Sequence, residues 1–155
     1  MEFLAEFHPK VIHFPIAFFL AYVLLESIGA IFKKDFFSKT AHLFLFFGVL
    51  GALAAVLTGN QAEETFEYWN KQSSDLVEEH ELFATITLWY FTGLLVLRTF
   101  VTVKKKFSGV FTYTFVVLAL VGAYFVFHTG DLGGQMVYRH GVGTEYKIKI
   151  MEADE

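Results

Sequence analysis

The sequence predicts an all-α membrane protein: a bundle of four transmembrane helices made of two helical hairpins, with a Gly-rich non-helical C-terminal tail. The chain is 55% hydrophobic and only 18% charged, whereas about a quarter of a soluble domain is charged. Four apolar runs approach the roughly 20 residues that cross a bilayer core, and no strand-like alternation suggests a barrel. We expect a single integral membrane domain, 1–155, with helices at about 11–32, 41–58, 82–103 and 108–128 and a tail at 129–155.

The charges of the connections predict how the chain is oriented. The first connection, 33–39, and the third, 104–106, each contain three lysines, whereas the second connection, 59–81, is strongly acidic. Lysine and arginine accumulate on the cytoplasmic side of a membrane. We therefore expect a multi-pass protein of the bacterial inner membrane, with the N-terminus and the C-terminus both on the periplasmic side.

The first hairpin combines a long apolar helix with a helix rich in small residues. The first run is interrupted only by Glu26. Pro15 cannot donate a backbone hydrogen bond, so it predicts a kink that frees the carbonyl of Val11; the alternative is that the spanning helix begins near Pro15. A small-residue face on the second helix predicts close helix packing; it consists of Gly48, Gly51, Ala52, Ala54 and Ala55.

The second hairpin opens at His80 and carries the other intramembrane charge, Arg98. Glu26 and Arg98 lie at similar depths, and an ionisable residue in a membrane requires a partner. We expect a structural ion pair between them, or an Arg98 side chain that reaches the headgroups. The fourth helix has a short small-residue face at Gly122 and Ala123. Four glycines within residues 133–143 predict turns rather than helix.

A weak internal repeat relates the two hairpins. His13 opens the first helix and Thr58 closes the second, while His80 opens the third and Thr129 closes the fourth. This pattern predicts two hairpins related by an axis along the membrane normal, with His13 and His80 facing each other at equal depth. Chance similarity is the alternative.

The histidines are the candidate functional residues. Five of the six fall at the predicted outer ends of helices or in outer segments; they are His8, His13, His80, His128 and His140. Imidazole is the commonest metal ligand in proteins, and a haem in a helix bundle needs two axial nitrogens from opposed helices. We expect His13 and His80 to be the axial pair of haem b, with His140 and His8 as further ligands or hydrogen-bonding groups. A second site that includes His128 is conceivable.

Other chemistries remain open for the same residues. The histidines could hold zinc or copper, together with Glu81 or Asp131. They could also serve only as helix caps and headgroup contacts, in a cofactor-free structural subunit of a membrane complex. The net charge of −4 and the lack of a large basic tract argue against nucleic acid as a partner. Without cysteine, the chain has no thiolate metal site, iron–sulfur cluster or c-type haem attachment.

The sequence resembles the membrane-protein family called domain of unknown function 2231. The resemblance rests on His8-Pro9, on His13-Phe14-Pro15-Ile16-Ala17, on Thr58-Gly59, on His80 and Arg98, and on the motif from Gly133 to Gly143. It implies a four-helix membrane domain whose functionally important residues lie in the opening and closing motifs. His42 and His128 are not part of the family pattern. The resemblance implies little about activity.

The leading functional hypothesis is therefore a b-type cytochrome-like protein that binds haem near the outer face. It would carry electrons between a periplasmic partner, such as a cytochrome, and the quinone pool or a larger complex. An electron-transfer or accessory subunit fits better than a stand-alone enzyme, because the sequence shows no nucleophile elbow, phosphate loop or His-Glu-x-x-His motif. A homodimer or a larger membrane complex is a possible assembly.

Overall fold

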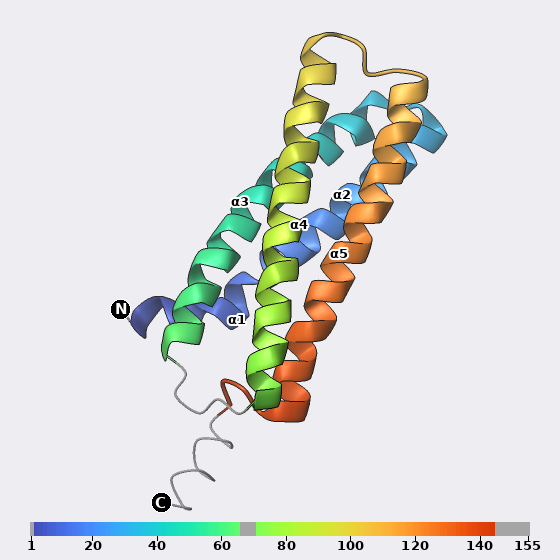
Figure 1. Ribbon diagram of the computed structural model, residues 1–155. Helices are drawn as coiled ribbons and strands as arrows, with labels where there is room; N and C mark the ends of the chain where they lie inside the picture. The colour runs from blue at the N-terminus through green and yellow to red at the C-terminus, as the bar shows by residue number, and fades with distance from the viewer. Residues whose placement is uncertain (1, 66–70, 145–155) are drawn as a thin grey trace, which may run out of the picture.

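A computed structural model describes residues 2–65 and 71–144, and within these ranges the protein is a bundle of four long helices (Figure 1). The chain opens with a 3-10 helix, η1 (Glu2–Phe7), and a short helix, α1 (His8–Val11). The long helices are α2 (His13–Phe32), α3 (Asp35–Thr65), α4 (Lys71–Val103) and α5 (Val110–His140). All four are long and apolar enough to cross a membrane. The predicted four-helix membrane bundle is confirmed.

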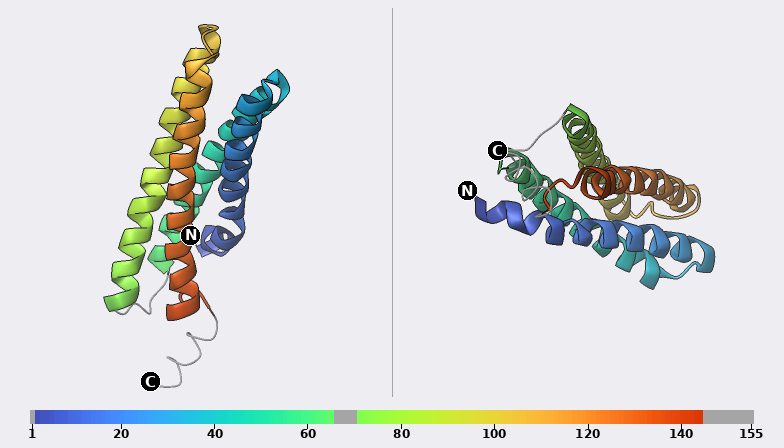
Figure 2. Two further views of the ribbon diagram at one scale, coloured as in Figure 1. Left: turned by 90° about the vertical axis from the view of Figure 1, so that its right-hand side faces the viewer. Right: turned by 90° about the horizontal axis from the view of Figure 1, so that it is seen from below.

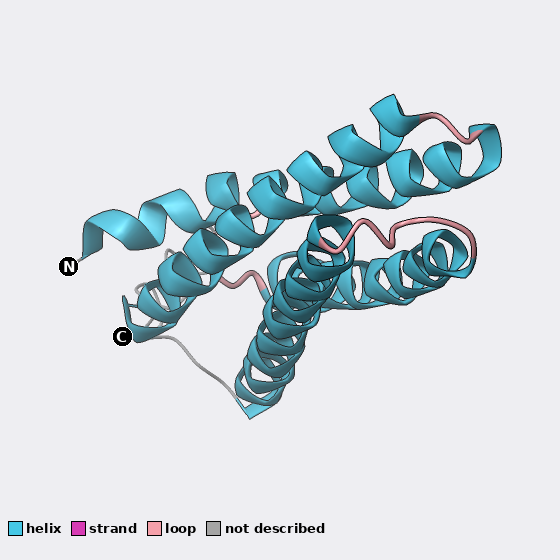
Figure 3. Cartoon of the chain, turned by 90° about the horizontal axis from the view of Figure 1, so that it is seen from above, coloured by secondary structure: helices cyan, strands magenta, loops and turns pink. Residues whose placement is uncertain are grey.

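The bundle is built as two layers, each an antiparallel hairpin. Helices α2 and α3 form one layer, and α4 and α5 form the other (Figure 2). Seen from above, the two layers cross each other (Figure 3). Both hairpin turns lie at one end, with Lys33, Lys34, Lys39 and Lys104–Lys106 in or beside them; we call this the basic end. The opposite end holds His8, His80, His128 and His140, and we call it the histidine end.

Pro15 bends the first hairpin where the sequence predicts a kink. Helix α1 stops at Val11 and α2 starts at His13, with Ile12 between them. The proline nitrogen has no hydrogen to offer the carbonyl of Val11, so the regular bonding pattern fails there. As a result, α1 lies at an angle to α2 (Figure 1). The bend directs the first residues of the chain, including His8, toward the end of α3.

The fourth helix is longer than predicted, so the predicted start of the tail at residue 129 is wrong. Helix α5 continues through Gly130, Gly133 and Gly134 to His140. It ends at Gly141, whose φ of 63° is left-handed and whose N–H donates to the carbonyl of Val137 at 3.0 Å. Packing outweighs the cost of about 1 kcal/mol for each glycine in a helix. Residues 145–155 of the predicted tail lie outside the described residues.

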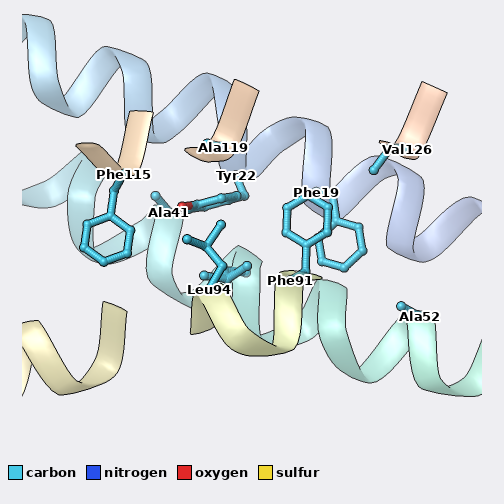
Figure 4. Close-up of a cluster of buried hydrophobic side chains, with 10 residues drawn as sticks. Phe19, Tyr22, Ala41, Ala52, Phe91, Leu94, Phe115, Ala119 and Val126 are labelled. Atoms are coloured by element: carbon cyan, nitrogen blue, oxygen red, sulfur yellow. The ribbon is translucent and has the colours of Figure 1, made fainter. Parts of the chain in front are cut away.

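The layers meet through aromatic rings that fit against glycines. Phe19 of α2 and Phe91 of α4 are stacked at the centre, with ring centroids 3.7 Å apart and planes 8° apart (Figure 4). A Cβ atom added to Gly48 would lie 2.5 Å from the Phe19 ring, and one added to Gly122 would lie 2.5 Å from the Phe91 ring. A Cβ atom added to Gly51 would lie 3.2 Å from Pro15. The predicted close packing therefore holds at Gly48, Gly51, Ala52 and Gly122, whereas Ala54 is exposed.

Substituting Gly122 by Ala will destabilise the bundle by about 1–3 kcal/mol, because an added methyl group must displace the stacked Phe91 ring. The matched control is Gly93→Ala on α4, where a Cβ atom meets nothing within 4 Å. That change should stabilise the helix by about 0.5–1 kcal/mol. Reversible unfolding in mixed detergent micelles, followed by circular dichroism, measures both. Equal effects of the two changes would contradict the packing argument.

Candidate functional site

His80 is held at the histidine end by the backbone of α5. Its Nδ1 atom lies 3.1 Å from the carbonyl oxygen of Thr129. A carbonyl can only accept, so Nδ1 carries the proton, and in the neutral ring Nε2 carries the lone pair. The Thr129 hydroxyl in turn lies 3.1 Å from the hydroxyl of Thr87, which donates to the carbonyl of Phe83 at 2.7 Å. These contacts fix the position and the tautomer of the His80 ring.

His8 has the same arrangement on the other hairpin. Its Nδ1 atom lies 3.1 Å from the hydroxyl oxygen of Thr58. That hydroxyl lies 2.9 Å and 3.0 Å from the carbonyls of Ala54 and Ala55, so its single hydrogen is directed to them. The Thr58 oxygen must therefore accept from His8, which again places the proton on Nδ1 and the lone pair on Nε2.

His8 and His80 lie on opposite layers of the bundle, within electrostatic range of each other. Each ring also lies over a glycine of the helix that holds it: an added Cβ would be 3.0 Å from Cε1 of His8 at Gly59 and 3.3 Å from Cε1 of His80 at Gly133. These glycines give the rings room that a side chain would fill. Gly133, which the sequence suggested as a turn residue, is instead part of the site.

The structure corrects the alignment of the internal repeat. The equivalent of His80 is His8 and not His13, because His8 contacts Thr58, 50 residues later, as His80 contacts Thr129, 49 residues later. His13 is exposed at the start of α2. The predicted equivalence of His13 and His80 is therefore wrong, whereas the role of His13 as a ligand stays a prediction.

The corrected repeat places three equivalent pairs between the layers. His8 and His80, Phe19 and Phe91, and Glu26 and Arg98 are all 72 positions apart. On α4, Phe91 and Arg98 follow His80 by 11 and 18 positions. Residues at these spacings lie on the same face of a helix, so all three side chains point toward the first layer. The two histidines lie at one end, the phenylalanines stack in the middle, and the charged pair lies toward the basic end. We call this set the interlayer ladder.

The predicted ion pair between Glu26 and Arg98 is confirmed. An Nη atom of Arg98 lies 2.7 Å from Oε2 of Glu26, and both residues are only 1% exposed. The same nitrogen donates to the carbonyl of Ser38 at 2.9 Å and lies 3.1 Å from its hydroxyl. The guanidinium also lies 4.2 Å from the centre of the Phe107 ring. Arg98 thus connects three helices and a loop.

The neighbours of this pair were not predicted from the sequence. Tyr22 is fully buried beside it, close enough to interact electrostatically with Glu26 and Arg98. The hydroxyl of Tyr22 and Oε1 of Glu26 are both buried without a hydrogen bond of standard geometry. The sequence offers no pattern that singles out Tyr22, Ser38 or Phe107 as partners of a charge.

The remaining histidines lie apart from the His8–His80 pair in their contacts. His128 packs against the rings of Phe83 and Tyr124, and its Nε2 atom is 4.0 Å from a carboxylate oxygen of Glu79. His140 is the last residue of α5. Within the ranges 2–65 and 71–144, no three His, Asp or Glu side chains are grouped so that they could hold a metal ion. Glu81 lies close enough to Glu63 for the two carboxyl groups to interact electrostatically.

Few aromatic side chains of the long helices lie near His128 at the histidine end. Phe83 touches His128, but Phe14, Trp89 and Phe127 are each more than half exposed on the apolar outer surface. Phe18 packs against rings of α3, and Phe125 packs against Tyr90. These aromatic side chains mostly cover the bundle where it faces lipid.

The fold and the buried polar pairs define a multi-pass helical membrane protein with two repeat-related hairpins. The chain belongs to the family described as predicted membrane protein (DUF2231), whose model matches residues 5–146. No curated protein matches the chain, and no solved structure does. The family of the chain is therefore established.

Proposed function

We propose that this protein is a b-type cytochrome-like electron-transfer protein, which binds haem b through His8 and His80 at the histidine end. The observation that carries this proposal is that two equivalent histidines, one on each layer, share one tautomer and lie within electrostatic range of each other. Each has Nδ1 held by an oxygen atom and Nε2 left as the basic nitrogen. An axial ligand of haem iron needs this state of the ring.

The residues around the pair fit such a ligand set. Hydrogen bonds from Nδ1 to Thr58 and Thr129 orient the rings and raise the basicity of Nε2. Gly59 and Gly133 leave the edges of the rings free of side chains. When bound, haem would supply one-electron transfer between a periplasmic partner, such as a cytochrome, and the quinone pool or a larger membrane complex. His140 and His128 remain candidates for additional ligands or hydrogen-bonding groups.

The proposed location is the inner membrane of a bacterium, with the basic end in the cytoplasm. Lysines gather at the two hairpin turns, and cytoplasmic loops carry an excess of such residues. The histidine end and both termini would then face the periplasm. This orientation places the proposed haem on the side where soluble electron carriers would meet it.

An absorption spectrum of the detergent-purified protein tests the proposal directly. We expect a Soret band in the oxidised protein and sharp α and β bands after dithionite reduction, as for six-coordinate, low-spin haem. The measured haem content should approach one per chain. A featureless spectrum from cells with an adequate haem supply would overturn the proposal. Elemental analysis of the same sample would then identify zinc or copper, or show a cofactor-free subunit.

A further inference from the structure

A groove of about 880 Å³ runs between α3 and α4 near the basic end. Its polar lining lies at the end nearest the hairpin turns and consists of Lys39, His42 and Thr99. The imidazole Nε2 of His42 is 3.0 Å from the hydroxyl of Thr99, which joins the two helices across the groove. His42 is not part of the His8–His80 site and lies at the opposite end of the protein, near the hairpin turns.

The deeper part of the groove is apolar. Its walls are formed by Leu43 and Phe46 of α3 and by Leu95 and Val96 of α4. Leu43, Phe46 and Val96 are 52%, 44% and 62% exposed, so their side chains are accessible to a molecule bound in the groove. From Lys39 to Phe46 the helix rises by about 10 Å. This length matches the first half of an acyl chain and lies parallel to the helices.

A second cation lies beside the mouth of the groove. The ammonium group of Lys104 is placed over the ring of Phe100, 5.6 Å from its centre, and Phe100 lines the groove. Lys39 thus lines the groove from α3, and Lys104 follows directly after Val103, the last residue of α4, which also lines the groove. Basic side chains at this level of a membrane protein attract anionic headgroups.

We propose that this groove binds one anionic phospholipid. Its phosphate would lie at Lys39 and Lys104, within reach of His42, and one acyl chain would lie along the apolar walls. Charge complementarity favours an anionic over a zwitterionic lipid, because the polar groups at the mouth include two cations and the deep part has none. The proposal concerns the basic end alone and does not depend on haem.

Native mass spectrometry of the full-length protein, delipidated and then supplied with phosphatidylglycerol, tests this site. We expect one retained phosphatidylglycerol, bound more tightly than phosphatidylethanolamine. Lys39→Gln should weaken its binding about fivefold. The matched control is Lys34→Gln, which removes an equal charge at the basic end but outside the groove and should leave binding unchanged. A loss that is equal in both variants would overturn the proposal.

A second variant tests the acyl part of the site. Val96→Trp fills the apolar groove from an exposed position without changing charge, and it should also weaken phosphatidylglycerol binding. Circular dichroism confirms that each variant is folded. Unchanged lipid binding in Val96→Trp would overturn the site, as would displacement of phosphatidylglycerol by a short-chain quinone at equal concentration, which would identify a quinone as the occupant.

Discussion

Replacing Arg98 by Leu will destabilise the protein by about 3–5 kcal/mol, the largest stability effect that we expect from a single change. The substitution leaves the carboxylate of Glu26 buried, at 1% exposure, without the cation that lies 2.7 Å from it. It also removes the donor to Ser38 and the cation over Phe107. Unfolding in mixed detergent micelles, followed by circular dichroism, measures the change.

Two further variants distinguish the buried pair from the loss of any arginine. Arg139→Leu removes an exposed arginine near the end of α5 and should change the free energy of unfolding by less than about 0.5 kcal/mol. The double variant Glu26→Leu/Arg98→Leu should recover most of the loss, because no uncompensated charge remains. If Arg98→Leu and Arg139→Leu destabilise the protein equally, the pair does not stabilise the interface between the layers.

The second large effect concerns the proposed haem. His8→Ala and His80→Ala should each lower the ratio of haem to protein close to zero, because each removes one of two axial nitrogens. Added imidazole should partly restore the spectrum of either variant by entering the space of the missing ring. The ratio of Soret absorbance to protein absorbance, after purification under identical conditions, provides the measurement.

The matched controls for this prediction are the other histidines. His42→Ala alters the opposite end of the bundle and should retain haem. His13→Ala decides between the two possible pairs: haem should be retained if His8 is the ligand. Haem retained in His8→Ala and lost in His13→Ala would establish the pair predicted from the sequence alone and contradict the one that the structure favours.

The number of helices and the Glu26–Arg98 pair could be predicted from the sequence. Long apolar runs leave few alternatives to spanning helices, and two isolated charges at matching depth have little choice of partner. The end of α5 could not be predicted, because Gly133 allows close contact with His80 and does not form a turn. Local propensity alone does not distinguish these two uses of glycine.

The equivalence of His8 and His80 in the repeat could be predicted from the sequence, but the predicted helix boundaries obscure it. An alignment on predicted helix starts pairs His13 with His80. Helix α4, however, begins at Lys71, nine residues before His80. His8, Phe19 and Glu26 have the same spacing as His80, Phe91 and Arg98. This spacing alone gives the alignment of the repeat, and no helix boundary has to be predicted. The contact between His42 and Thr99, by contrast, depends on how α3 and α4 pack, for which the sequence carries no periodic signal.

The charged members of the interlayer ladder have a consequence for how such a protein can arise and assemble. Glu26 and Arg98 occupy equivalent positions of the two hairpins but have opposite charges. Two copies of the first hairpin would bring two carboxylates together in the membrane, and two copies of the second would bring together two guanidinium groups. Each hairpin is thus complementary in charge to the other hairpin, whereas two copies of the same hairpin would repel each other. After a duplicated hairpin had diverged in this way, neither hairpin could pair with a copy of itself. Fusion of the two hairpins into one chain would then ensure that they are made in equal amounts.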